Sequence, residues 1–378
     1  MTARGKRLAI LASYAPSLVN FRGELLKEIR AAGAEVLALA PEFDRPTEER
    51  LKREGIACRT VPLERTGLNP FADLRTLRNL TAIFRNWRPD VVTGYTPKAA
   101  IYSALAADRA GVPHIAPMVT GLGYAFLKEP SLKLALVRQV TKQLYRSAFR
   151  VSHAAIFHND DDRRQLQGLG LVPRHLALHV VGGSGVDLRQ FPEQPLPPLN
   201  DGLTFLMIAR LVRYKGIFEY CEAARRIRAR GARATFRLIG PREGGPAGFG
   251  ESELAHYAGD VAYLGPRSDI AAQLGSTHVY VLPSYGEGMP RTVLEAMAVG
   301  RPVITTDANG CRDTVEELVN GLKVPVADTD RLVEAMEFFL KRPDLIASMA
   351  RASRQRAERL YDVRMVNRKT RIALQLED

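Results

Sequence analysis

Several features that mark familiar protein classes are scarce in this chain of 378 residues. Its three cysteines, Cys58, Cys221 and Cys311, are odd in number and widely spaced, which excludes a disulfide framework and a CxxC metal site. This usage suits a reducing cytosol. The seven histidines include no HExxH pair. We therefore expect neither a metal nor a redox group.

Long apolar runs are also missing. The N-terminal stretch "MTARGKRLAILAS" has an apolar run only from Leu8 to Ala12, shorter than the roughly seven residues of a secretory signal core, so it indicates a first strand. No run approaches the roughly 18 apolar residues of a membrane-spanning helix. We expect a soluble or, at most, peripheral protein.

Positive charge is plentiful, and it is unevenly distributed. The net charge is +13, and residues 1–195 carry 28 Lys and Arg against 18 Asp and Glu. The first half therefore meets an anionic partner, for which phosphate substrates, nucleic acid and an acidic membrane surface are the candidates.

Short apolar strands alternate with helical patterns along the whole chain, which predicts parallel sheets with helices on both faces. The proline-rich residues 191–202, "FPEQPLPPLNDG", interrupt this alternation and indicate a linker. We predict an α/β protein with one Rossmann-like doubly wound domain over 1–194 and a second over 195–361. A ligand is expected at the carboxyl ends of the strands, in the cleft between the domains.

The stretch "LPSYGEGMPRTVLEAMAVG", residues 282–300, joins a strand to a helix. Gly286 and Gly288 permit a tight turn, Pro290 suits the first helical position, and the helix start offers N–H groups to an anion. Glu287 is suited to sugar hydroxyls. Glu295 lies about 8–9 Å down the helix from its start, which is near the reach from a diphosphate to a ribose. An acidic, solvent-facing pair is the alternative.

Three further segments carry candidate residues. In "ARLVRYKGIFEY" (209–220), Arg210 and Lys215 follow a strand and suit a leaving diphosphate, or are ordinary surface cations. The loop "ASYAPSLVNFRGELL" (12–26) lacks GxGxxG and holds Ser17, Asn20 and Arg22, with N-capping by Asn20 as the alternative. A basic amphipathic helix at about 131–149 suits an anionic membrane or ordinary sheet packing, through its charges Arg138, Lys142, Arg146 and Arg150.

These motifs together resemble retaining glycosyltransferases of family 4, which have the GT-B fold of two facing Rossmann-like domains. The resemblance rests on the loop near residue 20, "TGLGYAF", "GSGVDLRQF", "ARLVRYKG", "YLGPRSDI" and "EGMPRTVLEAMAVGRPVI". Among members, the chain is similar to bacterial transferases that add N-acetylhexosamine, such as GalNAc, from a UDP-sugar to undecaprenyl-diphosphate-linked saccharides. "RTGLNPFADLRTL" and "YLGPRSDI" carry that similarity.

The resemblance implies roles for individual positions. Arg210 and Lys215 match the pair that binds the donor diphosphate, Glu287 matches the acid at the donor sugar, and Glu295 matches the acid at the ribose. The rest of the implied donor site is Gly240, Pro266, Arg267, Gly288, Met289 and Pro290. Many members carry a histidine near the reacting sugar, where this chain has Thr120. The C-terminal helix, about 362–378, is expected to pack back on the first domain.

The resemblance implies metal-independent retaining transfer in surface polysaccharide or glycan assembly, by an enzyme in the cytoplasm at the inner face of the cell membrane. The expected partners are a nucleotide sugar, a lipid-linked saccharide and an anionic membrane, without nucleic acid. Two alternatives stay open: a UDP-sugar 2-epimerase and a basic nucleic-acid-binding protein. The acidic run "HNDDD" (158–162) follows a strand, which favours helix capping over metal binding.

Overall fold

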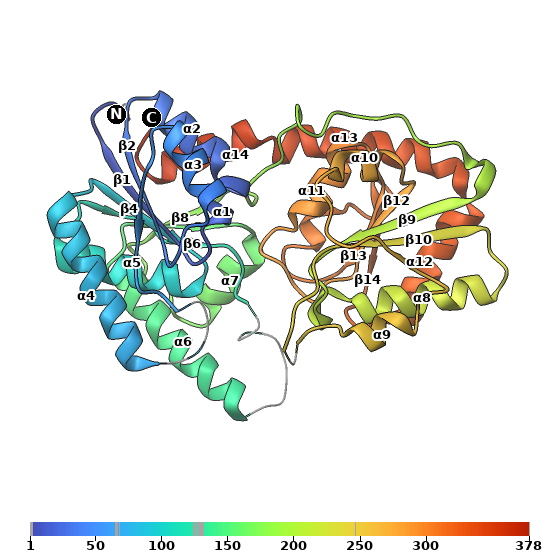
Figure 1. The fold of residues 1–378 in the computed structure, drawn as a ribbon, viewed down its shortest axis with the longest axis horizontal. Coiled ribbons are helices and arrows are strands. Elements are labelled where there is room, and N and C mark those ends of the chain that lie inside the picture. The colour runs from blue at the N-terminus through green and yellow to red at the C-terminus, as the bar shows by residue number, and fades with distance from the viewer. Residues whose placement is uncertain are drawn as a thin grey trace. The chain divides into compact units, whose positions relative to one another are not determined.

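Fourteen strands form two separate parallel sheets within the part of the chain that the structure, a computed structural model, describes (Figure 1). The described residues are 3–64, 67, 69–123, 126, 132–245 and 247–377. Parts of "TGLGYAF" and "RTGLNPFADLRTL" lie outside them. The chain divides into unit 1, residues 1–184 and 364–378, and unit 2, residues 185–363. The chain passes from unit 1 to unit 2 at Ser184–Gly185, earlier than the predicted boundary at 194, and returns at Val363–Arg364.

Unit 1 contains a sheet of eight strands in the order β3-β2-β1-β4-β6-β7-β8, with β5 beside β4. The strands are β1 (Arg7–Ala12), β2 (Glu35–Ala40), β3 (Ala57–Thr60), β4 (Val91–Tyr95), β5 (His114–Ile115), β6 (Met118–Val119), β7 (Ala154–Phe157) and β8 (Ala177–Val180). The helices are α1 (Pro16–Asn20), α2 (Gly23–Ala31), α3 (Arg45–Arg53), α4 (Pro70–Trp87), α5 (Pro97–Ala110), α6 (Leu132–Arg150), α7 (Asp160–Gly168) and α14 (Val363–Ala373).

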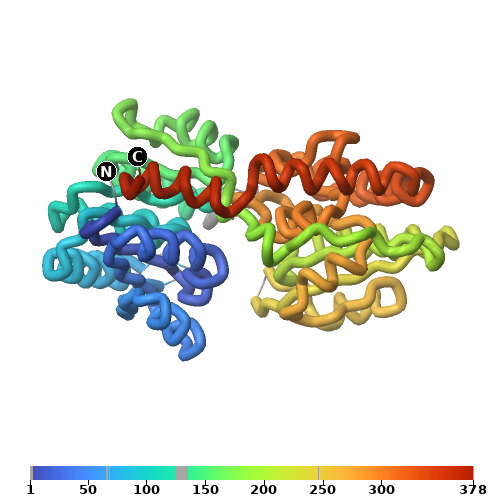
Figure 2. The backbone as a smooth tube through the Cα atoms, turned by 90° about the horizontal axis from the view of Figure 1, so that it is seen from above, coloured from blue at the N-terminus to red at the C-terminus, as the bar shows by residue number. Residues whose placement is uncertain are grey.

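Helices cover both faces of this sheet, so unit 1 has two apolar cores. One core joins the sheet to α4, α5, α6 and α7, through residues such as Phe84, Tyr102 and Phe149. The other joins it to α2, α3 and α14, through residues such as Leu26 and Leu374. Helix α14 is fastened by the imidazole of His114, 2.9 Å from the Ala373 carbonyl. The two chain ends therefore lie side by side in unit 1 (Figure 2).

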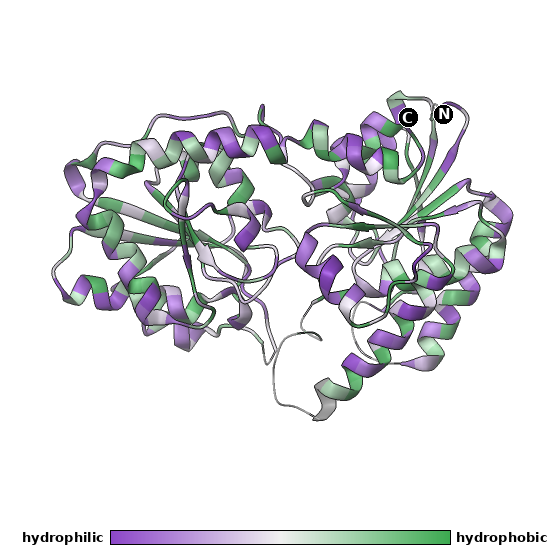
Figure 3. Ribbon diagram, turned by 180° about the vertical axis from the view of Figure 1, so that it is seen from behind, coloured by the Kyte–Doolittle hydropathy of each residue, from purple (hydrophilic) through white to green (hydrophobic). Residues whose placement is uncertain are grey.

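Unit 2 contains six parallel strands in the order β11-β10-β9-β12-β13-β14. They are β9 (Leu203–Ile208), β10 (Ala234–Ile239), β11 (Ala262–Tyr263), β12 (Val279–Leu282), β13 (Val303–Thr306) and β14 (Gly321–Val324). Its helices are α8 (Ile217–Ala229), α9 (Glu251–Ala255), α10 (Ile270–Gly275), α11 (Arg291–Ala298), α12 (Thr329–Lys341) and α13 (Ile346–Tyr361). Strands that are buried on both faces consist of continuous apolar runs. Figure 3 shows such apolar strands, flanked by helices that carry both polar and apolar residues.

A fully buried arginine fastens the proline-rich segment to unit 2. Arg301 is 0% exposed, and burial lowers its pKa to about 10. Its guanidinium donates to six backbone carbonyls, those of Gln194, Pro195, Leu274, Gly275, Val299 and Gly300. Residues 191–202, which the sequence indicated as an interdomain linker, are therefore part of unit 2.

Candidate active site

The strand order of unit 2 reverses between β9 and β12, and this switch point is where open parallel sheets bind ligands. Arg210 and Lys215 follow β9, and Glu287 follows β12. Gly240 follows β10, and Arg267 follows β11. Because carboxyl ends of parallel strands meet at one edge, the predicted donor residues gather along a single edge of this sheet.

Lys215 and Glu287 form an ion pair across the switch point. Their side chains are 16% and 14% exposed, and the Ser284 hydroxyl donates to the same Glu287 oxygen at 2.8 Å. Gly216 makes this approach possible: it has φ +77°, and a Cβ there would lie 2.2 Å from the Pro283 carbonyl oxygen. The sequence placed these two residues in one site but did not predict that they pair.

The loop around Glu287 is held by the segment that follows strand β13 (Val303–Thr306). The Glu287 amide donates to the Asn309 carbonyl at 2.9 Å, and Gly310, with φ +70°, leaves no room for a Cβ beside the Glu287 carbonyl. Gly288 and Met289 lead into α11. Pro290 is the N-cap of α11 rather than its first residue, a one-residue correction, because its extended ψ of 100° precedes the helix at Arg291.

Glu295 lies on α11, is 8% exposed and accepts a hydrogen bond from Arg291 Nε at 2.9 Å. Burial raises the pKa of Glu295, and the neighbouring Arg291 opposes that shift. The alternative of a solvent-facing acidic pair is therefore wrong for Glu295. The two glutamates have different cationic partners, Lys215 for Glu287 and Arg291 for Glu295. Arg291 was missed, although the i,i+4 spacing to Glu295 signals it.

Arg210 is anchored by a carboxylate and a phenol. Its guanidinium pairs with Glu243 and donates to the Tyr214 hydroxyl at 3.1 Å, leaving the side chain 40% exposed. Gly240 lies against the same strand end, since a Cβ there would be 1.8 Å from the Ala209 carbonyl oxygen. The anchored arginine can present its remaining donors to an anion.

Pro266 and Arg267 lie in the loop after β11, beside Gly240, whose amide donates to the Gly265 carbonyl at 3.1 Å. Arg267 is paired with Asp269 through two hydrogen bonds of 2.8 Å, and this pairing holds the pKa of Asp269 well below its usual range. The loop thus adjoins the predicted donor site at the next strand end.

The strand order of unit 1 reverses between β1 and β4, and hydroxyls join the two strands there. Ser13 Oγ lies 2.8 Å from Thr96 Oγ1. Thr96 has φ +73° and ψ 150°, a region that is nearly restricted to glycine. Strain of this kind gathers at functional sites. The sequence gave no signal for it.

Three of the predicted unit 1 candidates belong to one edge. Ser17 is buried, with its hydroxyl 2.8 Å from the Tyr95 hydroxyl. Arg22 is 3% exposed, lies over the Tyr95 ring at 5.2 Å, and donates through Nη2 to His158 Nε2 at 2.8 Å. Thr120 is half-buried after β6, and the His158 amide donates to the adjacent Val119 carbonyl at 3.1 Å.

His158 is a buried polar partner of Arg22. Burial, reinforced by Arg22, holds the pKa of His158 well below its usual value. Because a guanidinium only donates, Nε2 is the acceptor and the imidazole is neutral. A histidine directly after the strand "AAIF" is the signal that points to this edge.

Two segments were candidates for helix capping, Asn20 and the acidic run "HNDDD". Asn20 is the exposed last residue of α1 and does not cap α2, which begins at Gly23 after Arg22. The capping interpretation of "HNDDD" is confirmed, since Asn159 Oδ1 accepts from the Asp162 amide at 2.7 Å.

The basic residues of α6 are partly covered. Arg138, Lys142 and Arg146 are half-buried, Arg150 is exposed, and Arg146 donates to Gln143 Oε1 at 3.0 Å. Over the residues that the structure describes, no helix combines the length and apolarity needed to cross a bilayer.

Comparison with known proteins matches both units. Residues 19–182 match the family described as "Glycosyl transferase 4-like domain", and residues 202–342 match "Glycosyl transferases group 1". A Campylobacter jejuni N,N'-diacetylbacillosaminyl-diphospho-undecaprenol alpha-1,3-N-acetylgalactosaminyltransferase is 29% identical over 93% of this chain and 94% of its own. An Escherichia coli UDP-Gal:alpha-D-GlcNAc-diphosphoundecaprenol alpha-1,3-galactosyltransferase is 28% identical over 73% of each.

Solved structures agree on the fold. The Anabaena protein HepE in complex with UDP superimposes with a TM-score of 0.75 at 17% identity, covering 98% of this chain and 99% of that one. Sucrose-phosphate synthase from Thermosynechococcus elongatus gives 0.77 at 17% identity, covering 96% of each. The chain is a glycosyltransferase of group 1, family 4, and has the GT-B fold.

Proposed function

We propose that this glycosyltransferase moves N-acetylhexosamine, with GalNAc the first candidate, from a UDP-sugar to a polyprenyl-diphosphate-linked saccharide, with retention at the anomeric carbon. The Campylobacter and Escherichia relatives are named as transferases that act on diphosphoundecaprenol-linked saccharides, which supports this acceptor class. The observation that carries the proposal is the pairing of Lys215 with Glu287 at the switch point of unit 2.

Two cations and the start of α11 receive the donor diphosphate in this proposal. Arg210 and Lys215 supply fixed positive charge, and the α11 amides supply N–H donors. Glu287 binds the sugar hydroxyls beside the loop of Gly288, Met289 and Pro290. Glu295 binds the ribose hydroxyls, with Gly240, Pro266 and Arg267 at the nucleobase end.

The reaction proceeds by attack on the face from which the phosphate leaves. The bond from the anomeric carbon to the phosphate oxygen breaks, and the acceptor oxygen forms its bond on the same side. The departing phosphate takes the acceptor proton, so no separate protein base is required. Arg210 and Lys215 stabilise the charge that grows on the leaving diphosphate, and the reaction needs no metal.

Unit 1 supplies the acceptor side of the proposal. Ser17, Arg22 and Thr120 lie at the carboxyl edge of its sheet, with Asn20 at the exposed end of α1. The enzyme works in the cytoplasm on the inner face of the cell membrane, and the basic face of α6 is one candidate for the contact.

A donor screen tests this function. The full chain is incubated with a synthetic polyprenyl-diphosphate saccharide and, in turn, UDP-GalNAc, UDP-GlcNAc and UDP-Gal, with and without EDTA, and NMR reads the new linkage. We expect an α-linked product, fastest from UDP-GalNAc and unchanged by EDTA. An inverted linkage, or loss of turnover with EDTA, contradicts the mechanism. Conversion of the donor without acceptor indicates the epimerase alternative.

A further inference from the structure

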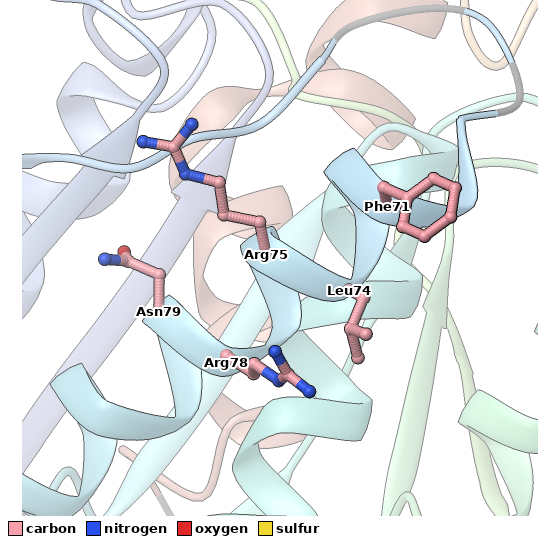
Figure 4. A pocket seen from close by; sticks show the side chains of 5 residues that line it. All are labelled: Phe71, Leu74, Arg75, Arg78 and Asn79. Atoms are coloured by element: carbon pink, nitrogen blue, oxygen red, sulfur yellow. The ribbon is translucent and has the colours of Figure 1, made fainter.

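The first turns of α4 expose an aromatic ring to solvent. Phe71 is 86% exposed, the largest value among the exposed large apolar residues of the described chain, and Leu74 is 43% exposed one turn later. With Arg75, Arg78 and Asn79 they line an open hollow of about 440 Å³ (Figure 4). We call Phe71, Leu74, Arg75 and Arg78 the Phe71 face.

The Phe71 face is exposed although the helix beneath it is firmly held. Asn69 caps α4 through its side chain, which accepts from the Ala72 amide at 3.3 Å. Asp73 pairs with Lys98 at 2.8 Å, and both side chains are nearly buried. Lys98 lies in the first turn of α5, directly after β4, so the pair fixes the start of α4 at the carboxyl edge of the unit 1 sheet. Phe71 is thus presented outward by a rigid support.

The exposed charges of α4 and α6 have one sign. Asp73 is the one acid between residues 69 and 88, and it is buried, whereas Arg75, Arg78 and Arg85 are exposed. Helix α6, which also packs on α5, lies in a stretch without Asp or Glu from 130 to 159, and its Leu136 is 64% exposed. Both helices therefore combine cations with an exposed apolar residue near their start.

We propose that the Phe71 face docks on an anionic phospholipid bilayer, with Phe71 and Leu74 at the acyl boundary and the two guanidiniums on lipid phosphates. An aromatic ring beside arginines is the composition of interfacial anchors, and planar guanidiniums bind phosphate oxygens in pairs. The biological reason for such docking rests on the proposed lipid-linked acceptor. The surface itself depends only on the exposure and charge of these residues.

Vesicle sedimentation of the full chain tests the surface without any substrate. Vesicles are made of phosphatidylcholine alone or with phosphatidylglycerol. We expect binding to the anionic vesicles that weakens with salt. R75Q/R78Q should lower the partition coefficient about thirtyfold, because each arginine near an anionic surface contributes a factor of about five. F71A should lower the partition coefficient about tenfold, because an apolar ring is lost from the bilayer. The matched controls in unit 2 are R351Q/R359Q, two exposed arginines of α13, and F218A, an exposed ring of α8.

Tryptophan quenching reports where the ring goes. The chain has one tryptophan, Trp87, at the far end of α4, which is about 24 Å from Phe71 along the helix axis. Brominated anionic lipids should quench F71W strongly and leave the wild-type Trp87 signal unchanged. Thermal unfolding midpoints within a degree or two of wild type show that the variants are folded.

The outcomes separate this proposal from the proposed function. With a short-chain, water-soluble acceptor, F71A and R75Q/R78Q should keep wild-type turnover, and with acceptor in anionic vesicles they should lose about tenfold or more. If the wild type uses neither acceptor, the proposed function is wrong, and the vesicle-binding measurements alone then decide whether the Phe71 face docks on a bilayer. Equal loss in the control variants, equal binding to neutral vesicles, or absence of F71W quenching overturns the surface. A dimer that F71A dissociates assigns the face to a second copy and overturns it too.

Discussion

Lys215 and Glu287 are 72 residues apart in the chain, yet their side chains meet as an ion pair between the ends of β9 and β12. In a site that binds a diphosphate sugar, this pairing places the cation to bind the diphosphate and the acid to bind the sugar of the same donor. The carboxylate orients the ammonium before the donor arrives, and both groups are already in place.

Replacing Lys215 by alanine should lower turnover about 10²–10³-fold, because a fixed charge aimed at the leaving group is lost. The variant also leaves Glu287 without its cation, so K215A/E287Q is the matched control that removes that unpaired charge. We expect the double variant to stay slow. Recovery of turnover in single-turnover assays of the double variant would mean that Lys215 acts only by neutralising Glu287.

Arg210→Ala should lower kcat about 10²-fold for the same electrostatic reason. Arg213 is a close control, because it lies in the same loop, is 54% exposed and pairs with Glu253. Arg213→Ala should stay within about twofold of wild type. Steady-state rates at saturating donor decide the matter, and equal losses in the two variants would remove Arg210 from the site.

UDP binding should weaken as the pH falls from neutrality toward 4.5, the ordinary value for glutamate. Burial raises the pKa of Glu295, so the carboxylate is protonated at a higher pH than an ordinary glutamate, and a neutral carboxyl accepts ribose hydroxyls less well. We expect an affinity loss of about tenfold, measured by calorimetry. Glu295→Gln should bind weakly with no such pH dependence.

The same raised pKa has the opposite effect on folding. The folded state binds the Glu295 proton more tightly than the unfolded state, so this residue's contribution to the free energy of unfolding rises as the pH falls through the folded pKa toward 4.5. The free energy of unfolding of wild type minus that of Glu295→Gln, measured by denaturation at a series of pH values, should increase as the pH falls. A UDP affinity that tracks stability with pH would argue against the ribose role.

Thr96→Gly should be more stable than Thr96→Ala by about 1 kcal/mol. Both variants lose the hydrogen bond to Ser13, but only glycine relieves the positive φ of 73°, a strain of about 1–3 kcal/mol. The entropy of glycine in the unfolded chain, about 0.5–1 kcal/mol, offsets part of that gain. Urea denaturation measures the difference, and equal stabilities would mean that the strain at Thr96 is no larger than the entropy cost of glycine.

Strand ends were the part of the site that the sequence could predict. Arg210 and Glu287 each follow an apolar run, and parallel strands bring such positions to one edge. Partners from distant segments were out of reach. The sequence around Arg210 does not indicate that Glu243, 33 residues away, pairs with it. The sequence around Arg22 likewise does not indicate its hydrogen bond to His158, 136 residues away. Backbone strain at Thr96 was equally hidden, because threonine is not a residue that favours positive φ.

The domain organisation was predictable in kind but not in position. Proline-rich residues 191–202 have linker composition, and composition alone does not reveal that they are bonded to a buried arginine. The chain instead leaves unit 1 at Gly185, where a Cβ would lie 2.7 Å from the Val363 Cα. That crossing has no proline signal.

Arg301 also sets where unit 2 can be cut from the chain for separate production. A fragment starting at residue 202, after the prolines, removes the carbonyls of Gln194 and Pro195 and leaves part of a buried guanidinium without acceptors. A fragment over residues 185–363 keeps all six carbonyls and both strands of the Val186–Asp362 bridge. Truncation series for this enzyme should therefore be designed around the arginine and not around the prolines.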